Sequence, residues 1–381
     1  MTSPILYAGQ EDISFTPAGA NFVSTTPPTV YGSFGPDTTA NTFRSGYARY
    51  AFSYISSVGY SGTPVDTIHY ARTAPAFTAT SFWVSMRINT YCANGSGVSG
   101  GIAGITPIRL ADSSGIVRLV LVLTGTTQSP NDNFNIKTVN AAGTQTIIGS
   151  ASTGKFMSFQ AATTTPAVVP DKIDIFVNYA VSGQIIVYCN GVQTFTYSGD
   201  ITTNSVTSLS YVDIGQTAFN NVFGTTCRSG YSEIIVSTSD TRNLSLVTQA
   251  PSAAGNTDTF TSGLFSNINQ NLANYTSPDN SATASQIQEY KVGQAIPTGS
   301  FSVISVVQHA MCTVGSTGPQ HIQFMVRTGS TDYNSASLAP GVAWGVLQNN
   351  WDTNPNTSAA WATTDLVASS VNFNIGYESI T

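Results

Sequence analysis

The carboxylates of this chain are few and are poorly spaced for acid–base chemistry. Glycoside hydrolysis needs two carboxyl groups about 5–10 Å apart, and residues two positions apart on a strand lie about 7 Å apart on one face. No acidic residue lies two positions from any of the four glutamates, which are Glu11, Glu233, Glu289 and Glu378. Asp171 and Asp174 are three positions apart, so we expect them on opposite faces of a regular strand. We therefore predict no catalytic residues and expect that the protein is not an enzyme.

Residues that could bind a metal ion are equally scattered. Asn131-Asp132-Asn133 is the best candidate for a calcium loop, but calcium takes about 6–8 oxygen ligands, and a polar turn is the simpler interpretation. The three histidines, His69, His309 and His321, are isolated from any further ligand in the sequence. The four cysteines include no C-x-x-C pair, so free thiols are favoured over two disulfides or a zinc site. We expect no metal and no cofactor.

One turn-rich region combines aromatic and polar residues in a way that suits sugar binding. Trp344 and Trp351 lie close in the sequence to Asn349, Asn350 and Asp352. Aromatic rings can stack on sugar rings, while amide and carboxylate groups bond to the sugar hydroxyls. The alternative interpretation is that these tryptophans pack the core of a second domain.

Glu233 and Arg242 are a second candidate pair, with a structural role. They are well-spaced opposite charges in a stretch that is otherwise poor in charge. They could clamp the last strand of a domain to the loop that follows it. The alternative is two solvated surface charges, and an exposed ion pair contributes little to stability.

The composition indicates the elements that must position these residues. Only 8% of the 381 residues are charged, against about 25% in an average soluble protein, whereas hydrophobic residues make up 41%. Ser, Thr, Asn and Gly replace the missing charges, and these residues suit the solvated faces and the turns of β-sheets. The 13 Lys and Arg residues are scattered and the net charge is −6, which argues against nucleic acid as a partner. No apolar window reaches ~18 residues, so no membrane span is expected.

Strand signals recur along most of the chain. Residues 82–89 alternate between apolar and polar side chains, and 116–123 reads as a central strand covered on both faces. Residues 172–198 predict a three-stranded antiparallel meander whose second turn is Asn190-Gly191, the dipeptide typical of a type I′ turn. The best short helix candidate is 284–290, and 328–365 reads as a long loop region. The pattern predicts an all-β protein.

The chain divides most naturally into three segments. Turn formers in residues 1–25 indicate an N-terminal arm or a first edge strand, and the strand pattern breaks near residue 250. We therefore expect an arm at 1–25, a jelly-roll domain at 26–250 and a second, smaller β-sandwich domain at 251–381.

Two sets of motifs carry a resemblance to known families. The meander, with its Asn190-Gly191 turn and the later Tyr211-Val-Asp-Ile-Gly, resembles the hairpins of concanavalin A-like and laminin-G-like jelly rolls. A second set resembles virion proteins of tailed bacteriophages, apart from Phe260, where a tryptophan would be expected. That set comprises Ser232-Glu233-Ile-Ile-Val, Asp240-Thr241-Arg242, Ala250-Pro251, Ala254-Gly255-Asn256-Thr257, 326–333, Asn354-Pro355 and Trp361.

The second resemblance implies a function and a location. It implies a non-enzymatic virion structural protein, such as a head decoration, collar or tail-fibre subunit, that acts through contacts with other virion proteins and forms a homo-oligomer. The N-terminus lacks a secretory signal, which fits synthesis in the host cytoplasm and assembly into the virion. The alternative function is that of an adhesin that binds a host-surface glycan.

Overall fold

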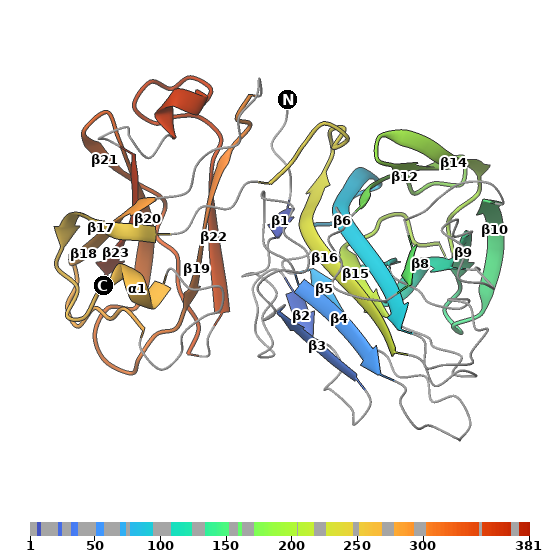
Figure 1. Cartoon of the computed structure of the whole chain (residues 1–381), viewed down its shortest axis with the longest axis horizontal. Helices are drawn as coiled ribbons and strands as arrows, with labels where there is room; N and C mark the ends of the chain where they lie inside the picture. The colour runs from blue at the N-terminus through green and yellow to red at the C-terminus, as the bar shows by residue number, and fades with distance from the viewer. Residues whose placement is uncertain are drawn as a thin grey trace. The chain divides into compact units, whose positions relative to one another are not determined.

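The computed structural model describes most of the chain. The described residues are 6–8, 22–24, 32–36, 51–56, 69–73, 77–93, 108–123, 134–151, 159–161, 171–203, 205–216, 226–246, 251–268, 278–292, 302–342, 345–366 and 373–381. The chain forms two compact units, and the boundary between them falls between Leu246 and Val247. Both units are built almost entirely from antiparallel strands (Figure 1).

The N-terminal unit is a jelly-roll sandwich of two sheets. Sheet A has the strand order β14 (Val192–Gly199), β13 (Gly183–Cys189), β12 (Asp171–Asn178), β6 (Ser81–Ala93), β16 (Thr226–Ser237), β4 (Ala51–Ser56) and β3 (Gly32–Pro36), with β1 (Leu6–Ala8) on β16 and β11 (Phe159–Ala161) on β6. Sheet B has the order β10 (Gln145–Ala151), β9 (Phe134–Val139), β8 (Val117–Leu123), β7 (Ile108–Ala111), β15 (Tyr211–Gln216), β5 (His69–Thr73) and β2 (Phe22–Ser24).

The core of this unit lies between the inner faces of the two sheets. Every second side chain of β6, β12 and β13 points inward, and the apolar residues of β7, β8 and β9 meet them from sheet B. The alternation predicted for 82–89 and for the meander is confirmed, since Phe82, Val84, Ile173 and Ile175 are all buried. β8 is buried on both faces, as expected for 116–123: Leu119 and Leu121 lie in the core, and Val120 and Val122 form a small apolar cluster on the opposite side.

The turn between β13 and β14 is the one that the sequence predicts. Asn190 and Gly191 have φ angles of +51° and +78°, the left-handed values that a type I′ turn requires at both central positions. The Asn190 amide also donates to Asp171 Oδ1 (2.6 Å), and its carbonyl oxygen accepts from the backbone N–H of Lys172 (2.9 Å). The turn is thus tied to the start of β12 as well as to its own hairpin.

The C-terminal unit is a smaller β-sandwich. Its larger sheet has the order β17 (Pro251–Asp258), β18 (Ile287–Val292), β23 (Asn374–Ile380), β20 (His321–Thr328) and β21 (Thr331–Asn334), and its smaller sheet pairs β19 (Val306–Cys312) with β22 (Gly345–Trp351). A four-residue helix, α1 (Phe265–Ile268), and a 3-10 turn at Thr363–Asp365 complete the described elements. Among the described helical segments, none is long and apolar enough to cross a membrane.

Two expectations for the C-terminal unit are wrong. The short helix expected at 284–290 is replaced from Ile287 onward by β18, which pairs with β17 on one side and with β23 on the other and is buried on both faces at Glu289 and Tyr290. Tertiary packing therefore overrides the helix propensity of the local Ala, Gln and Glu residues. The long loop expected at 328–365 contains β21 and β22.

Part of the N-terminal segment belongs to the sandwich. Within residues 1–25, β1 pairs with β16 of sheet A and β2 pairs with β5 of sheet B. These two short strands are the described part of the segment that the sequence predicts to be an arm or an edge strand.

Candidate functional site

The outer face of sheet A carries a cluster of aromatic side chains. Because β6, β12 and β13 send their apolar residues inward, Trp83, Phe176 and Tyr188 point away from the core. Trp83 and Phe176 are direct cross-strand partners, and their ring centroids lie 5.2 Å apart at 46°. Tyr188 stacks on Trp83, with 5.9 Å between the ring centroids and 28° between the ring planes. Trp83 and Phe176 remain partly exposed, whereas Tyr188 is 9% exposed.

Uncharged polar groups continue this surface along the same strands. Asn178 on β12 and Gln184 on β13 are cross-strand partners and are both partly exposed. Neither amide group has a hydrogen-bond partner within the part of the chain that the structure describes. Ile186 lies next to Phe176 across the β12–β13 pair. We call this set the aromatic face and define it as Trp83, Phe176, Asn178, Gln184 and Ile186.

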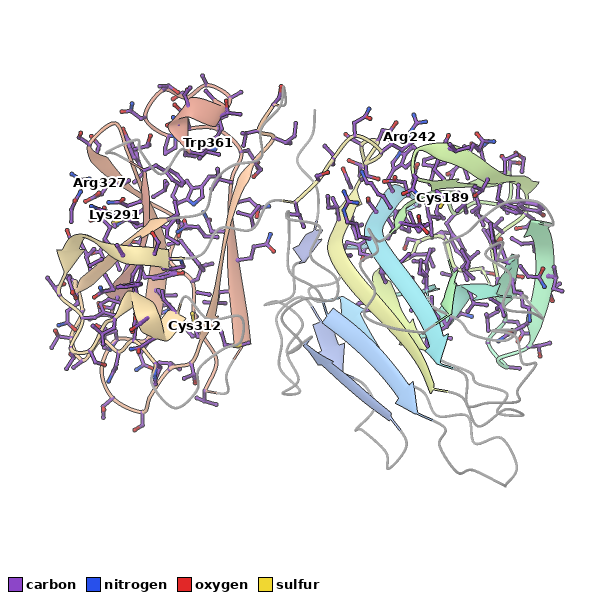
Figure 2. All side chains as sticks on the ribbon, viewed as in Figure 1. Cys189, Arg242, Lys291, Cys312, Arg327 and Trp361 are labelled. Atoms are coloured by element: carbon purple, nitrogen blue, oxygen red, sulfur yellow. The ribbon has the colours of Figure 1, made fainter. Side chains whose placement is uncertain are left out.

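The segment after β16 forms one border of the aromatic face. Arg242, which Figure 2 labels in the N-terminal unit, is the residue at this border. It lies over the rings of Tyr188 and Trp83, with its guanidinium carbon 4.6 Å and 5.4 Å from their centroids. Its Nη2 is 2.6 Å from Asp240 Oδ2, and its Nε donates to both oxygens of that carboxylate. The hydrogen bond from Arg242 is the main cause that lowers the pKa of Asp240. Arg242 and Asp240 therefore neutralise each other at the edge of the face.

Lys172 of β12 fixes this segment against the sheet. Its ammonium group donates to three backbone carbonyl oxygens, those of Thr241 (2.9 Å), Arg242 (2.8 Å) and Leu244 (2.5 Å). Thr241 Oγ1 donates to the buried carboxylate of Asp174 (2.9 Å), which lies 3.8 Å from the Lys172 ammonium. The position of Arg242 over the aromatic rings is thus set by contacts on both sides of it in the chain.

The sequence predicts a clamp between Glu233 and Arg242, and the side chain of Glu233 lies outside the described residues. Arg242 uses Asp240 as its ion-pair partner, and the clamp on the segment after β16 comes from Lys172. A lysine on a distant strand fills this role because cross-strand packing brings it close. Lys172 and Arg242 lie 70 residues apart, so the sequence alone does not reveal this contact.

Three of the five residues expected to contact glycan in the C-terminal unit, Asn350, Trp351 and Asp352, make contacts within the unit. Trp351 packs against the core of the unit, and its indole N–H donates to Gln308 Oε1 (2.6 Å). Asp352 accepts from Ser305 Oγ (3.0 Å), and Asn350 accepts from Gln348 (2.6 Å). Asn349 is partly exposed on β22, and Trp344 lies outside the described residues.

The motif residues of 326–333 are likewise engaged in local structure. Arg327 on β20 pairs with Asp332 on β21 at 2.6 Å, and the turn between these strands uses Gly329 and Ser330 at φ angles of +57° and +69°. Tyr333 donates to Asn356 Oδ1 (3.0 Å). These contacts explain the residue types of the motif without a ligand.

The sequence carries a signal for the single rings of the aromatic face, although not for their pairing across two strands. Trp83 and Phe176 occupy the polar positions of strands whose other face is apolar. Large aromatic residues on the solvent side of a sheet are candidates for binding. Possible metal ligands show no comparable grouping: in the described part of the chain, no three His, Cys, Asp or Glu residues are placed to hold a metal ion.

Comparisons with known proteins give structural matches only. No protein-family model matches the chain, and no curated protein matches its sequence. An endo-β-1,4-glucuronan lyase from the fungus Trichoderma reesei has a TM-score of 0.41 at 9% identity, over 62% of this chain and 96% of its own. An alginate lyase from Alteromonas sp. 272 has a TM-score of 0.30 at 10% identity, over 54% and 93% of the two chains. A family 7 alginate lyase has a TM-score of 0.33 at 14% identity, over 55% and 82%.

These matches correct the main functional expectation. These three structures are polysaccharide lyases and not proteins of a virion, so the expectation of a non-enzymatic virion structural protein is wrong, and its glycan-binding alternative agrees better with them. The TM-scores lie below 0.5, so the glycan-binding alternative depends on the side chains of the aromatic face. The phage resemblance, the homo-oligomer and the virion location stay predictions.

Proposed function

We propose that the N-terminal unit binds carbohydrate on the aromatic face. The observation that carries this proposal is the partly exposed Trp83–Phe176 pair, which lies beside two amide groups that have no partner among the described residues. A sugar ring has apolar C–H faces that stack on aromatic rings, and hydroxyl groups around its edge that bond to amides. Aromatic surface with a few convergent polar groups is the usual composition of a small-molecule site.

The face is suited to binding because its residues are already fixed. Trp83, Phe176, Asn178 and Gln184 all lie on paired strands of sheet A, and sites on strands are more precise than sites on loops. The bordering segment is held by Lys172 and Asp174. Little backbone entropy is then lost on binding, which leaves more of the contact energy as affinity.

Glycan-array binding followed by calorimetry tests the proposal. Trp83→Ala and Asn178→Ala should each weaken binding at least tenfold, the first through lost stacking and the second through a lost hydrogen bond. Asn135→Ala is the matched control, because Asn135 is a partly exposed asparagine on the outer face of sheet B, and it should bind as the parent does. If no glycan binds, or if all three variants bind equally, the proposal is wrong.

The same samples address catalysis. Mass spectrometry of the glycan recovered from the complex tests the expectation that the protein is not an enzyme. Intact chains after prolonged incubation would agree with binding alone, and shortened chains would assign a cleavage reaction to this protein.

A further inference from the structure

We infer that the aromatic face selects neutral glycans over glycans that carry uronic acids. This inference rests on the proposed function and adds the class of ligand. Its basis is the state of the charged groups around the face. Arg242 is the charged side chain that lies over the rings, and its guanidinium is already bonded to both oxygens of Asp240.

Two further cations among the described side chains of this outer face, Lys172 and Arg87, are also poorly placed to bind a uronate. Lys172 has three backbone carbonyl oxygens around its ammonium and the Asp174 carboxylate at 3.8 Å, so it has no donor to spare. Arg87 lies four positions from Trp83 along β6, about 13 Å away at the rise of a strand. It is the cross-strand partner of Lys172 and lies at the same level of the sheet as that residue.

A uronate on this face would meet an unfavourable field. Its carboxylate would have to compete with Asp240 for Arg242 or lie near a second negative charge, and like charges at short range repel. The groups that remain for recognition are the amides of Asn178 and Gln184 and the hydroxyls of the exposed Thr196 and Ser198 on β14. Such groups recognise hydroxyl groups without a charge requirement.

Matched oligosaccharides test the inference. The pairs are cello-oligosaccharide with glucuronan, and β-1,4-mannan with mannuronan, which differ only in the oxidation of C6 to a carboxylate. In the pair that binds, the neutral oligosaccharide should bind at least tenfold more tightly than the acidic one. The affinity of the neutral oligosaccharide should be the same at 50 mM and at about 500 mM salt. The inference is wrong if the acidic oligosaccharide binds at least as tightly as the neutral one and loses affinity both in salt and in Trp83→Ala. That result would leave the proposed function intact. Absence of binding by every member and by the glycan array overturns both.

Release of Arg242 gives a second, independent readout. Asp240→Asn removes the carboxylate that occupies Arg242 and keeps the Lys172 contacts to the backbone, so binding of the acidic member should rise at least tenfold while that of the neutral member stays the same. Asp332→Asn is the matched control, because it releases Arg327 from a similar pair in the other unit and should change neither affinity. An unchanged preference in Asp240→Asn would show that the Arg242–Asp240 pair does not set the selectivity.

Discussion

Single residues on the outer face of sheet A show which groups are committed to structure and which are available. Tyr188 is covered by Arg242 and is 9% exposed, so it acts as packing beneath the guanidinium. Trp83 and Phe176 keep part of their surface in solvent. The division between structural and binding residues on this face therefore follows the position of one arginine side chain.

Ser85 allows a prediction about stability at the residue scale. Its hydroxyl is buried and has no hydrogen-bond partner among the described residues, so it contributes the cost of burial without the gain of a bond. Ser85→Ala should leave the free energy of unfolding unchanged or raise it by up to ~1 kcal/mol. Ser237→Ala is the control: Ser237 is also buried, but its Oγ accepts from the backbone N–H of Ser239, and its loss should cost about 1 kcal/mol. Chemical denaturation of both variants provides the measurement, and a clear loss in Ser85→Ala would contradict the prediction.

At the scale of elements, the β13–β14 turn depends on the amide of Asn190. Asn190→Asp would place a second carboxylate against Asp171, at the position where the amide now donates over 2.6 Å. We expect a loss of about 2–3 kcal/mol in the free energy of unfolding at pH 7, from a hydrogen bond to a charged group and from repulsion. The loss should shrink in acid, because a proton on the introduced carboxyl group removes the repulsion and restores a donor to Asp171.

Asn140→Asp is the control for this prediction. Asn140 also holds a turn, but it does so through its side-chain oxygen, which accepts from the N–H groups of Ala142 and Thr144. An aspartate keeps that acceptor, so the variant should be nearly as stable as the parent. Denaturation curves at pH 7 and pH 4 for both variants decide the question, and equal losses in the two would refute the role given to Asp171.

The strands could be predicted from the sequence, but the binding face could not. Alternation of apolar residues is local, so Phe82 with Val84 and Ile173 with Ile175 reveal β6 and β12 directly. The neighbourhood of Trp83 and Phe176 depends on the register between these two strands, which is set by packing over a long stretch of chain. Trp344 and Trp351 were the predicted glycan contacts because they lie close together in the sequence, although Trp351 packs against the core of the C-terminal unit.

At the scale of the whole molecule, several carboxylates link stability to acid. Burial by itself would raise the pKa of Asp112, but hydrogen bonds from Arg118 and from the backbone N–H groups of Ile116 and Ser114 outweigh it and lower the pKa below its usual 3.8. The pKa of Asp240 is lowered as well, by Arg242. A lowered folded-state pKa gives stability that is complete above the unfolded pKa and is lost as the pH falls through the folded pKa.

The N-terminal unit should therefore lose stability progressively below pH 3.8. Urea denaturation at a series of pH values between 6 and 2 measures this loss. Asp112→Asn should flatten the dependence, because it removes one of the groups that must take up a proton. A parent curve without any decline in this range would contradict the assignment of Asp112 and Asp240.

The contacts of Lys172 also determine which antibodies can recognise the surface around Arg242. A peptide of residues 238–246 would contain Arg242 but neither the lysine, which lies 70 positions earlier in the chain, nor the rings beneath the guanidinium. An antibody raised against that peptide would select for conformations that the folded protein excludes. The surface around Arg242 is thus a discontinuous epitope, and serum against the folded unit is the reagent that would block it.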